Sequence, residues 1–194
     1  MKLPRIVLLA ALSGIPALGE TGSTDVPKII GPDAGTITTS TINVLPPFLV
    51  ADVDVTLDIT HSFALDLDVF LIHPDGVTMV ELLTAVGDEF DNFSNTVLDD
   101  EASVLISDGN APFAGTFRPE ESLAAFDGLP AQGLWTLHIS DLGDLDGGTL
   151  NSWSLRLTDL AEVPEPNIIL LCSASLAVLV WRQRICVRSR GSRR

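Results

Sequence analysis

The chain has 194 residues, of which 46% are hydrophobic and 19% charged, enough for one domain with a sizeable core. Its 11 basic and 26 acidic residues give a net charge of −15. This charge excludes a general nucleic-acid binder, because such a protein presents a basic surface to the phosphates. The charge is unevenly spread: residues 20–163 carry three basic and 25 acidic side chains, a net charge of −22, whereas residues 182–194 carry six arginines and no acid.

Residues 1–19 have the features of a secretory signal peptide. Lys2 and Arg5 make a positive start, an apolar stretch follows, and Ala17-Leu18-Gly19 offers the small residues that a signal peptidase reads. The alternative is a buried N-terminal helix, which Pro16 disfavours because proline interrupts a helix. We therefore expect export through the inner membrane.

The end of the chain combines a short motif, an apolar run and a basic tail. These are the linker 159–167, which contains Val163-Pro164-Glu165-Pro166, the apolar residues 168–181, and the arginine-rich residues 182–194, which include Arg182 and Arg184. A helix of 14 residues reaches about 21 Å, less than the roughly 30 Å of a hydrocarbon core. The arginines are expected to stay on the cytoplasmic side, which leaves the acidic part of the chain outside.

This order of features resembles the PEP-CTERM sorting signal of Gram-negative bacteria. The resemblance implies that an exosortase acts near Pro164-Glu165-Pro166 and that the protein reaches the cell envelope or cell surface or is secreted. A plain single-pass anchor in the inner membrane is the alternative. Both cysteines, Cys172 and Cys186, lie in this tail, so the exported part is expected to fold without disulfides.

The middle of the chain predicts an all-β fold. Residues 20–35 read as a flexible lead-in, and from 36 to 158 short β-rich runs recur between turn signals, which is typical of an antiparallel sandwich of seven or eight strands. One short helical turn is expected within 120–126. The predicted strands are Thr36–Val44, Val53–His61, Leu67–His73, Val77–Leu83, Val104–Ile106, Trp135–Ser140 and Leu150–Leu157.

Two segments of this region resemble the P domain (Homo B) of proprotein convertases. The first carries His61, Asp66, Leu67, Leu71, Pro74 and Gly76, and the second carries Gly133, Trp135, Leu137, Ile139, Asp141, Gly148, Leu150, Trp153, Leu155 and Leu157. The resemblance covers about 36–158, although residues 88–130 match only loosely. It implies a jelly-roll β-sandwich of the galactose-binding-like kind, which usually follows a subtilisin-like catalytic domain and stabilises it. No catalytic domain is recognised in this sequence.

The sequence predicts no enzyme. A Gly-x-Ser-x-Gly elbow is missing, and His61, His73 and His138 lie at strand positions or ends without a spacing typical of metal ligands. We interpret the three histidines as structural or solvated. A Ser-His-Asp triad assembled from distant segments remains an alternative, because such triads are recognised only by their geometry.

The acidic residues predict a calcium site. Ca²⁺ takes six to eight oxygen ligands, often from aspartate-rich turns with glycine. The candidate ligands are Asp66, Asp68, Asp141, Asp144 and Asp146, the last three within six residues of one another. A solvated acidic loop is the alternative interpretation.

These observations predict an exported, non-catalytic module with a binding or structural role in the envelope or extracellular matrix. Its partner would be a polysaccharide or a protein. The alternative is an accessory P domain that acts in trans with a subtilisin-like serine protease. A third hypothesis is a Ca²⁺-dependent enzyme with a site formed across loops.

Overall fold

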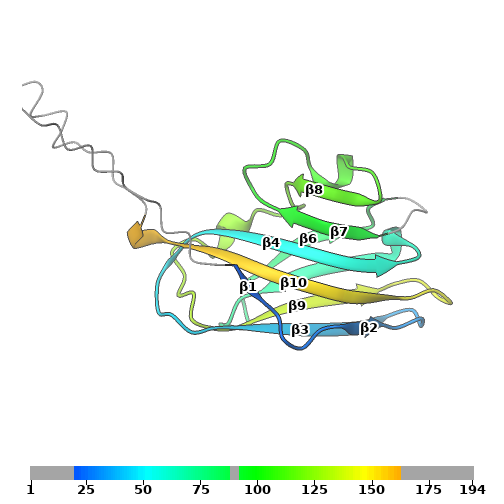
Figure 1. Ribbon diagram of the computed structural model, residues 1–194, viewed down its shortest axis with the longest axis horizontal. Helices are drawn as coiled ribbons and strands as arrows, with labels where there is room; N and C mark the ends of the chain where they lie inside the picture. The colour runs from blue at the N-terminus through cyan, green and yellow to red at the C-terminus, as the bar shows by residue number, and fades with distance from the viewer. Residues whose placement is uncertain (1–19, 88–91, 163–194) are drawn as a thin grey trace, which may run out of the picture. The chain divides into compact units, whose positions relative to one another are not determined.

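The computed structural model describes residues 20–87 and 92–162 (Figure 1). The predicted signal peptide, the Val163–Pro166 motif, the apolar run and the arginine tail lie outside these residues. Within the described part of the chain, no helix is long and apolar enough to cross a membrane.

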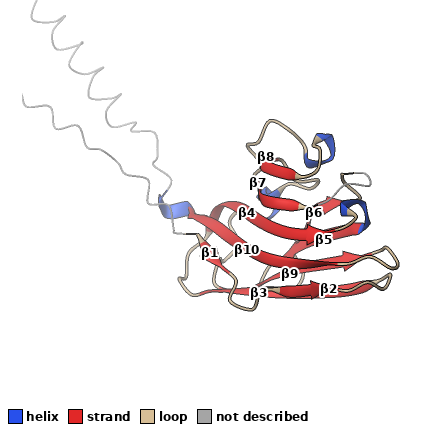
Figure 2. Ribbon diagram, turned by 45° about the vertical axis from the view of Figure 1, so that its right-hand side comes forward, coloured by secondary structure: helices blue, strands red, loops and turns tan. Residues whose placement is uncertain are grey.

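The described residues form two β-sheets, which confirms the predicted sandwich (Figure 2). The larger sheet has the order β1-β10-β4-β7-β8, with β2 also paired to β10, and the smaller sheet has the order β3-β9-β5-β6. The strands are β1 Thr21–Gly22, β2 Lys28–Ile30, β3 Thr36–Val44, β4 Val50–His61, β5 Leu67–Ile72, β6 Met79–Thr84, β7 Phe93–Leu98, β8 Phe113–Phe117, β9 Gly133–Asp141 and β10 Gly148–Asp159. Three short 3-10 helices lie between strands and a fourth follows the last strand: η1 Ala64–Asp66, η2 Ile106–Asp108, η3 Leu123–Phe126 and η4 Leu160–Glu162.

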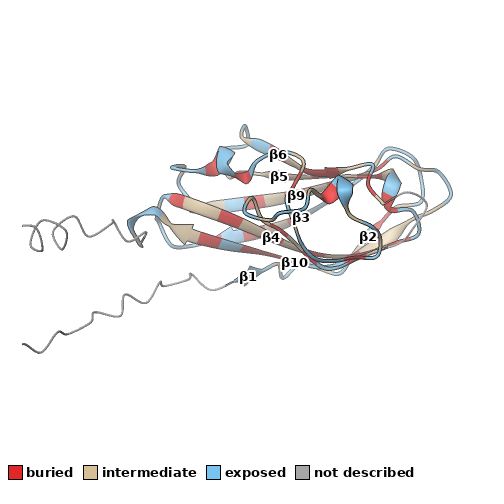
Figure 3. Cartoon of the chain, turned by 90° about the horizontal axis from the view of Figure 1, so that it is seen from above, coloured by how far each residue is buried: buried red, intermediate tan, exposed pale blue. Residues whose placement is uncertain are grey.

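The long strands follow the alternation of their sequences. In β4, Val53, Val55, Leu57 and Ile59 are buried, and the polar residues between them are half-buried. Figure 3 colours the strands by this burial. This period of two is what a strand with one buried face requires. The largest buried side chains of the core are Trp135, Phe93, Phe113 and Phe126.

Two features differ from the sequence-based prediction of an antiparallel sandwich. The pair β7 and β8 is parallel, and neither strand was predicted. Both lack clean alternation, because Asn95 and Gly115 have φ angles of +49° and +115° and the register shifts between Phe93 and Thr96. The predicted antiparallel arrangement is therefore wrong for this pair.

The prediction of a strand at Val104–Ile106 is also wrong. Leu105 forms only an isolated bridge with Arg118, and the chain then turns into η2, where Asp108 N donates to the Leu105 carbonyl oxygen. The turn places Ile106 in the core, so this apolar run fills the sandwich from a loop.

The lead-in 20–35 contributes two short strands where the sequence indicated none. Both β1 and β2 pair with β10, and Ile30 is 1% exposed. The N-terminal segment also covers Ser154, which is buried and whose hydroxyl donates to the Glu20 carboxylate. The jelly-roll connectivity and the C-terminal helix stay predictions.

Candidate functional site

A polar cluster lies at the end of the sandwich where β4 ends, η1 leads into β5, and a turn joins β9 to β10. The turn between β2 and β3 lies at the same end, on the right in Figure 1. Leu145 N donates to the Pro32 carbonyl oxygen at 2.8 Å, and Leu142 N donates to the Asp66 carbonyl oxygen at 2.8 Å. Backbone bonds therefore hold three loops together here.

The centre of the cluster is a buried pair formed by His61 and Asp141. Their side chains are both 0% exposed, and His61 Nε2 lies 3.1 Å from Asp141 Oδ2. His61 Nδ1 lies 2.8 Å from the Phe63 carbonyl oxygen and 3.2 Å from Phe63 N. Asp141 Oδ1 accepts a hydrogen bond from Gly143 N at 3.1 Å. Both nitrogens of the imidazole and both oxygens of the carboxylate are thus engaged within the fold.

Two further carboxylates adjoin this pair. Asp146 Oδ2 lies 3.9 Å from His61 Nδ1, and both carboxylate oxygens of Asp146 are buried without a hydrogen-bond partner. Gly143 leaves space for Asp146 and Asp66, because a Cβ at position 143 would clash with Asp66 Oδ2 and lie 2.7 Å from Asp146 Oδ1. Burial, together with the charges of Asp146 and Asp141, raises the pKa of Asp66.

The structure brings together three of the five aspartates that the sequence singled out, namely Asp66, Asp141 and Asp146. The other two make different contacts. Asp68, on β5, accepts a hydrogen bond from the Thr84 hydroxyl on β6, and Asp144 accepts one from Ala34 N at 3.0 Å. Among the described residues, no group of three or more His, Cys, Asp or Glu side chains is arranged so that it could hold a metal ion.

Sequence reasoning missed the partnership of His61 with Asp141. The two residues are 80 positions apart. A signal was nevertheless present, since Asp141 continues the inward alternation of Leu137 and Ile139 and was therefore due to be buried. A buried aspartate needs a hydrogen-bonding partner, and a strand-end histidine is a suitable one.

The other two histidines lie apart from this cluster. His73 is buried, with Nε2 3.0 Å from the Pro130 carbonyl oxygen and its ring edge-on to Trp135 at a centroid distance of 4.9 Å. His138 lies on the outer face of the smaller sheet, where Nε2 is 3.2 Å from Ser140 Oγ. These contacts are those of structural side chains.

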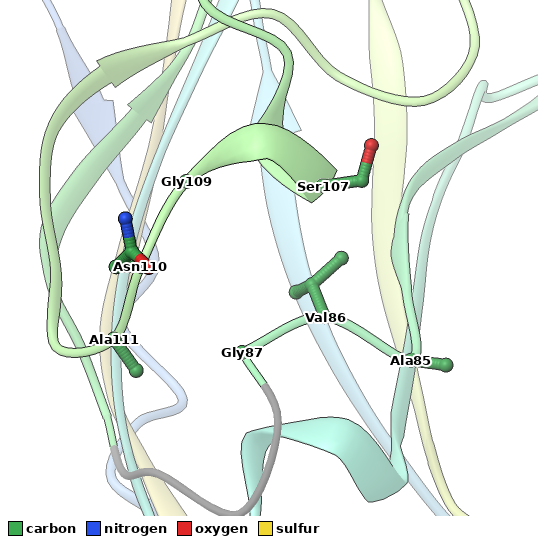
Figure 4. Close-up of a pocket in the computed structure, with 7 residues that line it drawn as sticks. All are labelled: Ala85, Val86, Gly87, Ser107, Gly109, Asn110 and Ala111. Atoms are coloured by element: carbon green, nitrogen blue, oxygen red, sulfur yellow. The ribbon is translucent and has the colours of Figure 1, made fainter.

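A separate pocket opens between the loop after β6 and the loop after η2 (Figure 4). It is lined by Ala85, Val86, Gly87, Ser107, Gly109, Asn110 and Ala111. These residues offer one hydroxyl and one amide but no titratable side chain. The pocket therefore could form hydrogen bonds through Ser107 and Asn110, but its lining has no acidic or basic side chain.

The described residues form a β-sandwich, and the buried histidine of its polar cluster, His61, contacts groups of the same domain through both ring nitrogens. The model of the proprotein convertase P-domain family matches residues 50–157, which extends from β4 through most of β10. The chain belongs to this family. The sequence-based resemblance to the P domain is therefore confirmed.

Solved structures with a similar fold include two of a serine protease from Aeromonas sobria. The protease itself is 21% identical, with a TM-score of 0.47 over 73% of this chain and 26% of that chain. The same protease in complex with its chaperone ORF2 is 22% identical, with a TM-score of 0.48 and the same coverage. The match thus spans about a quarter of the length of these proteins. No curated protein sequence matches the chain.

Proposed function

We propose that this chain is a non-catalytic P-domain module that binds a separate subtilisin-like serine protease and stabilises it. The observation that carries the proposal is the family match over residues 50–157, which takes in seven of the ten strands. The family's usual place beside a catalytic domain supports a protease as the partner.

The geometry of His61 supports a non-catalytic role. A general base must reach a proton of its substrate, directly or through one water. The side chain of His61 is 0% exposed, and both of its nitrogens face groups of the same domain. It orders the end of the sandwich and has no position from which to meet a substrate.

Exposed apolar side chains beside the cluster support a protein partner. Leu65 lies in η1 and Phe63 directly precedes it, and Leu142 and Leu145 lie in the turn between β9 and β10. The backbone bond between Leu142 N and the Asp66 carbonyl oxygen holds the two loops together. We call these four residues the apolar tip. Large apolar residues grouped on a surface are typical of a binding site, and we assign the contact with the protease to this tip.

The test adds equimolar full-length chain to a subtilisin-like serine protease of the same organism that is produced without a P domain of its own. We expect a longer half-life of protease activity at elevated temperature and co-elution of the two proteins. The double variant Leu142→Asp, Leu145→Asp should weaken binding at least tenfold. The control Val77→Asp, at an exposed position at the opposite end of the smaller sheet, should bind normally.

An unchanged protease half-life together with separate elution would contradict the proposed partner. Normal binding by the double variant would instead contradict the assignment of the apolar tip. The two failures are therefore distinguishable in one set of measurements.

The tail of the sequence supports a second candidate role, in the cell envelope or extracellular matrix. It combines Val163-Pro164-Glu165-Pro166, an apolar run, and Arg182 and Arg184. Under this proposal a signal peptidase and an exosortase process the chain, and the domain binds an extracellular polysaccharide or protein. Replacing residues 164–166 by alanine should leave the protein uncleaved in the inner-membrane fraction. Unchanged processing of this variant would contradict the route.

A further inference from the structure

Leu145, in the turn between β9 and β10, combines two properties that are each unfavourable for a leucine. Its side chain is 95% exposed, more than any other large apolar side chain among the described residues. Its backbone has a φ angle of +72°, in the left-handed region. Glycine and asparagine suit this region, whereas a bulky side chain in it is strained. The fold itself therefore gives no reason for a leucine at this position.

The other left-handed positions show what this fold accepts elsewhere. Within residues 20–87 and 92–162, the other non-glycine residues with a positive φ are Ala85, Asn92 and Asn95. Two of these are asparagines, and the third has only a methyl group as its side chain. Leu145 is thus the one bulky side chain held in this conformation in the described part of the chain. Backbone strain is typically retained at places of function, where the surrounding structure enforces it.

Two hydrogen bonds fix the turn that carries Leu145. Leu145 N donates to the Pro32 carbonyl oxygen at 2.8 Å, and Ala34 N donates to Asp144 Oδ1 at 3.0 Å. Both bonds connect the turn to the loop between β2 and β3, and the pairing of β2 with β10 holds that loop in place. The backbone at Leu145 is therefore ordered before a partner arrives. A preorganised contact loses little conformational entropy on binding.

The surroundings of Leu145 indicate the chemistry of the surface that it fits. Leu142, which is 57% exposed, adds a second apolar side chain to the turn. Asp144 and Asp33, in the turn and in the loop bonded to it, are both exposed. The domain as a whole is acidic, with a net charge of −22 over residues 20–163. A complementary surface combines an apolar centre with a basic rim.

We propose that Leu145 is the anchor of the apolar tip and inserts into an apolar pocket with basic side chains at its rim on the protease partner. This inference rests on the proposed function, and it adds the residue that carries most of the contact and the chemistry of the surface that receives it. A few residues usually supply most of the binding energy of an interface. The strained conformation holds the leucine in the position from which it can enter a concave site.

The first measurement is thermal unfolding of the purified full-length protein alone. The variant Leu145→Gly should raise the Tm by roughly 2–4 °C, because glycine adopts a positive φ without strain. Leu145→Asn should also raise the Tm, since asparagine tolerates the same region. The matched control Leu45→Gly makes the same exchange at a leucine that is 69% exposed and lies outside the left-handed region, beyond the other end of β3. It should not raise the Tm.

The second measurement is binding to the protease without a P domain of its own that tests the proposed function. Leu145→Gly and Leu145→Asn should each bind roughly tenfold more weakly than the wild type, whereas Leu45→Gly should bind normally. The association rate of the wild type should fall by about tenfold from low to high salt, because a basic rim attracts the acidic tip.

A higher Tm together with weaker binding is the result expected for a leucine retained for its contact. If the wild type binds the protease and both Leu145 variants bind equally well, the anchor is overturned. An unchanged or lower Tm in both variants would also overturn it, because no strain would then be stored at this position. A salt-independent association rate would contradict the basic rim. Absence of binding by the wild type would contradict the proposed function and, with it, the partner of the anchor, whereas the Tm measurements involve no protease.

Discussion

At the scale of single residues, the tightest steric constraint lies where β10 begins beside the polar cluster. Gly148 is paired opposite His61 in the register of β10 and β4. A Cβ at position 148 would clash with the Thr60 carbonyl oxygen and lie 2.6 Å from His61 Cδ2. Neither group can move easily, because one belongs to the backbone and the other to a buried ring.

The variant Gly148→Ala should therefore destabilise the domain by about 2–3 kcal/mol, as forced overpacking does. Equilibrium unfolding in urea measures this change. The control Gly22→Ala, where the nearest atom to a new Cβ is 3.9 Å away, should stay within about 0.5 kcal/mol of the wild type. Equal stability of Gly148→Ala and the wild type would mean that the backbone relaxes around this position.

The residues of the candidate site could be predicted only in part from the sequence. Spacing and composition indicated Asp66, Asp141 and Asp146 as members of acidic turns, but they indicated Asp68 and Asp144 equally strongly. Only contacts between distant segments separate these groups. Asp66 and Asp146 approach each other beside Gly143, and Asp141 binds the buried His61, whereas Asp68 and Asp144 accept hydrogen bonds from a hydroxyl and a backbone amide.

At the scale of elements, β10 connects the N-terminal segment to the rest of the larger sheet. It pairs with β4 on one side and with both β1 and β2 on the other. In the pairing with β2, Ile30 lies opposite Gly148 and Ile29 lies opposite Thr149. Ile30 points into the core at 1% exposure, whereas Ile29 is 72% exposed.

The variant Ile30→Ala should cost about 2–4 kcal/mol, because it leaves a cavity in the core. The matched control Ile29→Ala should change the free energy of unfolding by less than about 0.5 kcal/mol. Chemical denaturation of both variants decides whether the segment 20–35 is part of the folded domain. Similar small effects in the two variants would show that it is a dispensable lead-in.

The elements that the sequence predicted best are those with clean alternation. Thr36–Val44 is recovered residue for residue as β3, and β4 and β10 extend the predicted runs at their ends. The parallel pair β7 and β8 was missed because left-handed residues interrupt its pattern. Alternation reports a strand only while the backbone stays regular.

At the scale of the whole molecule, folding also brings acidic residues together at a second place, around Asp54 on β4. Burial raises the pKa of Asp54 to about 6, with further contributions from the charges of Asp52 and Asp99. Asp99 is far from β4 in the sequence, so this interaction exists only in the folded chain. Arg156 opposes the shift, with Nη1 3.7 Å from Asp54 Oδ2.

The pH dependence follows from the direction of this shift. Because the pKa of Asp54 is higher in the folded state than its ordinary value of 3.8, the folded state binds more protons between these two values. The contribution of Asp54 to stability is therefore present at low pH and is lost as the pH rises from about 4 to about 6.

The variant Asp54→Asn should flatten this part of the pH profile and raise the Tm at pH 7.5 by roughly 2–4 °C, the change expected for about 1 kcal/mol. Thermal unfolding in EDTA-containing buffers at pH 4.5, 6 and 7.5 measures it. The control Asp58→Asn, also on β4, removes a carboxylate that Asn151 hydrogen-bonds, and should not raise the Tm at pH 7.5. A lower Tm in Asp54→Asn at pH 7.5 would contradict the prediction and would mean that the Arg156 pair dominates.

The sequence alone determined the local and additive properties of this protein: the all-β class, most strand positions, the acidic charge of residues 20–163 and the resemblance to the P domain. These follow from alternation, turn residues and composition, which act over a few neighbouring positions. The tertiary structure decided the pairing of β2 with β10, the parallel pair β7 and β8, and the meeting of His61, Asp66, Asp141 and Asp146. Contacts of this kind join segments up to 122 positions apart, as in the pairing of Lys28 with Leu150, and no local pattern specifies which distant groups will meet.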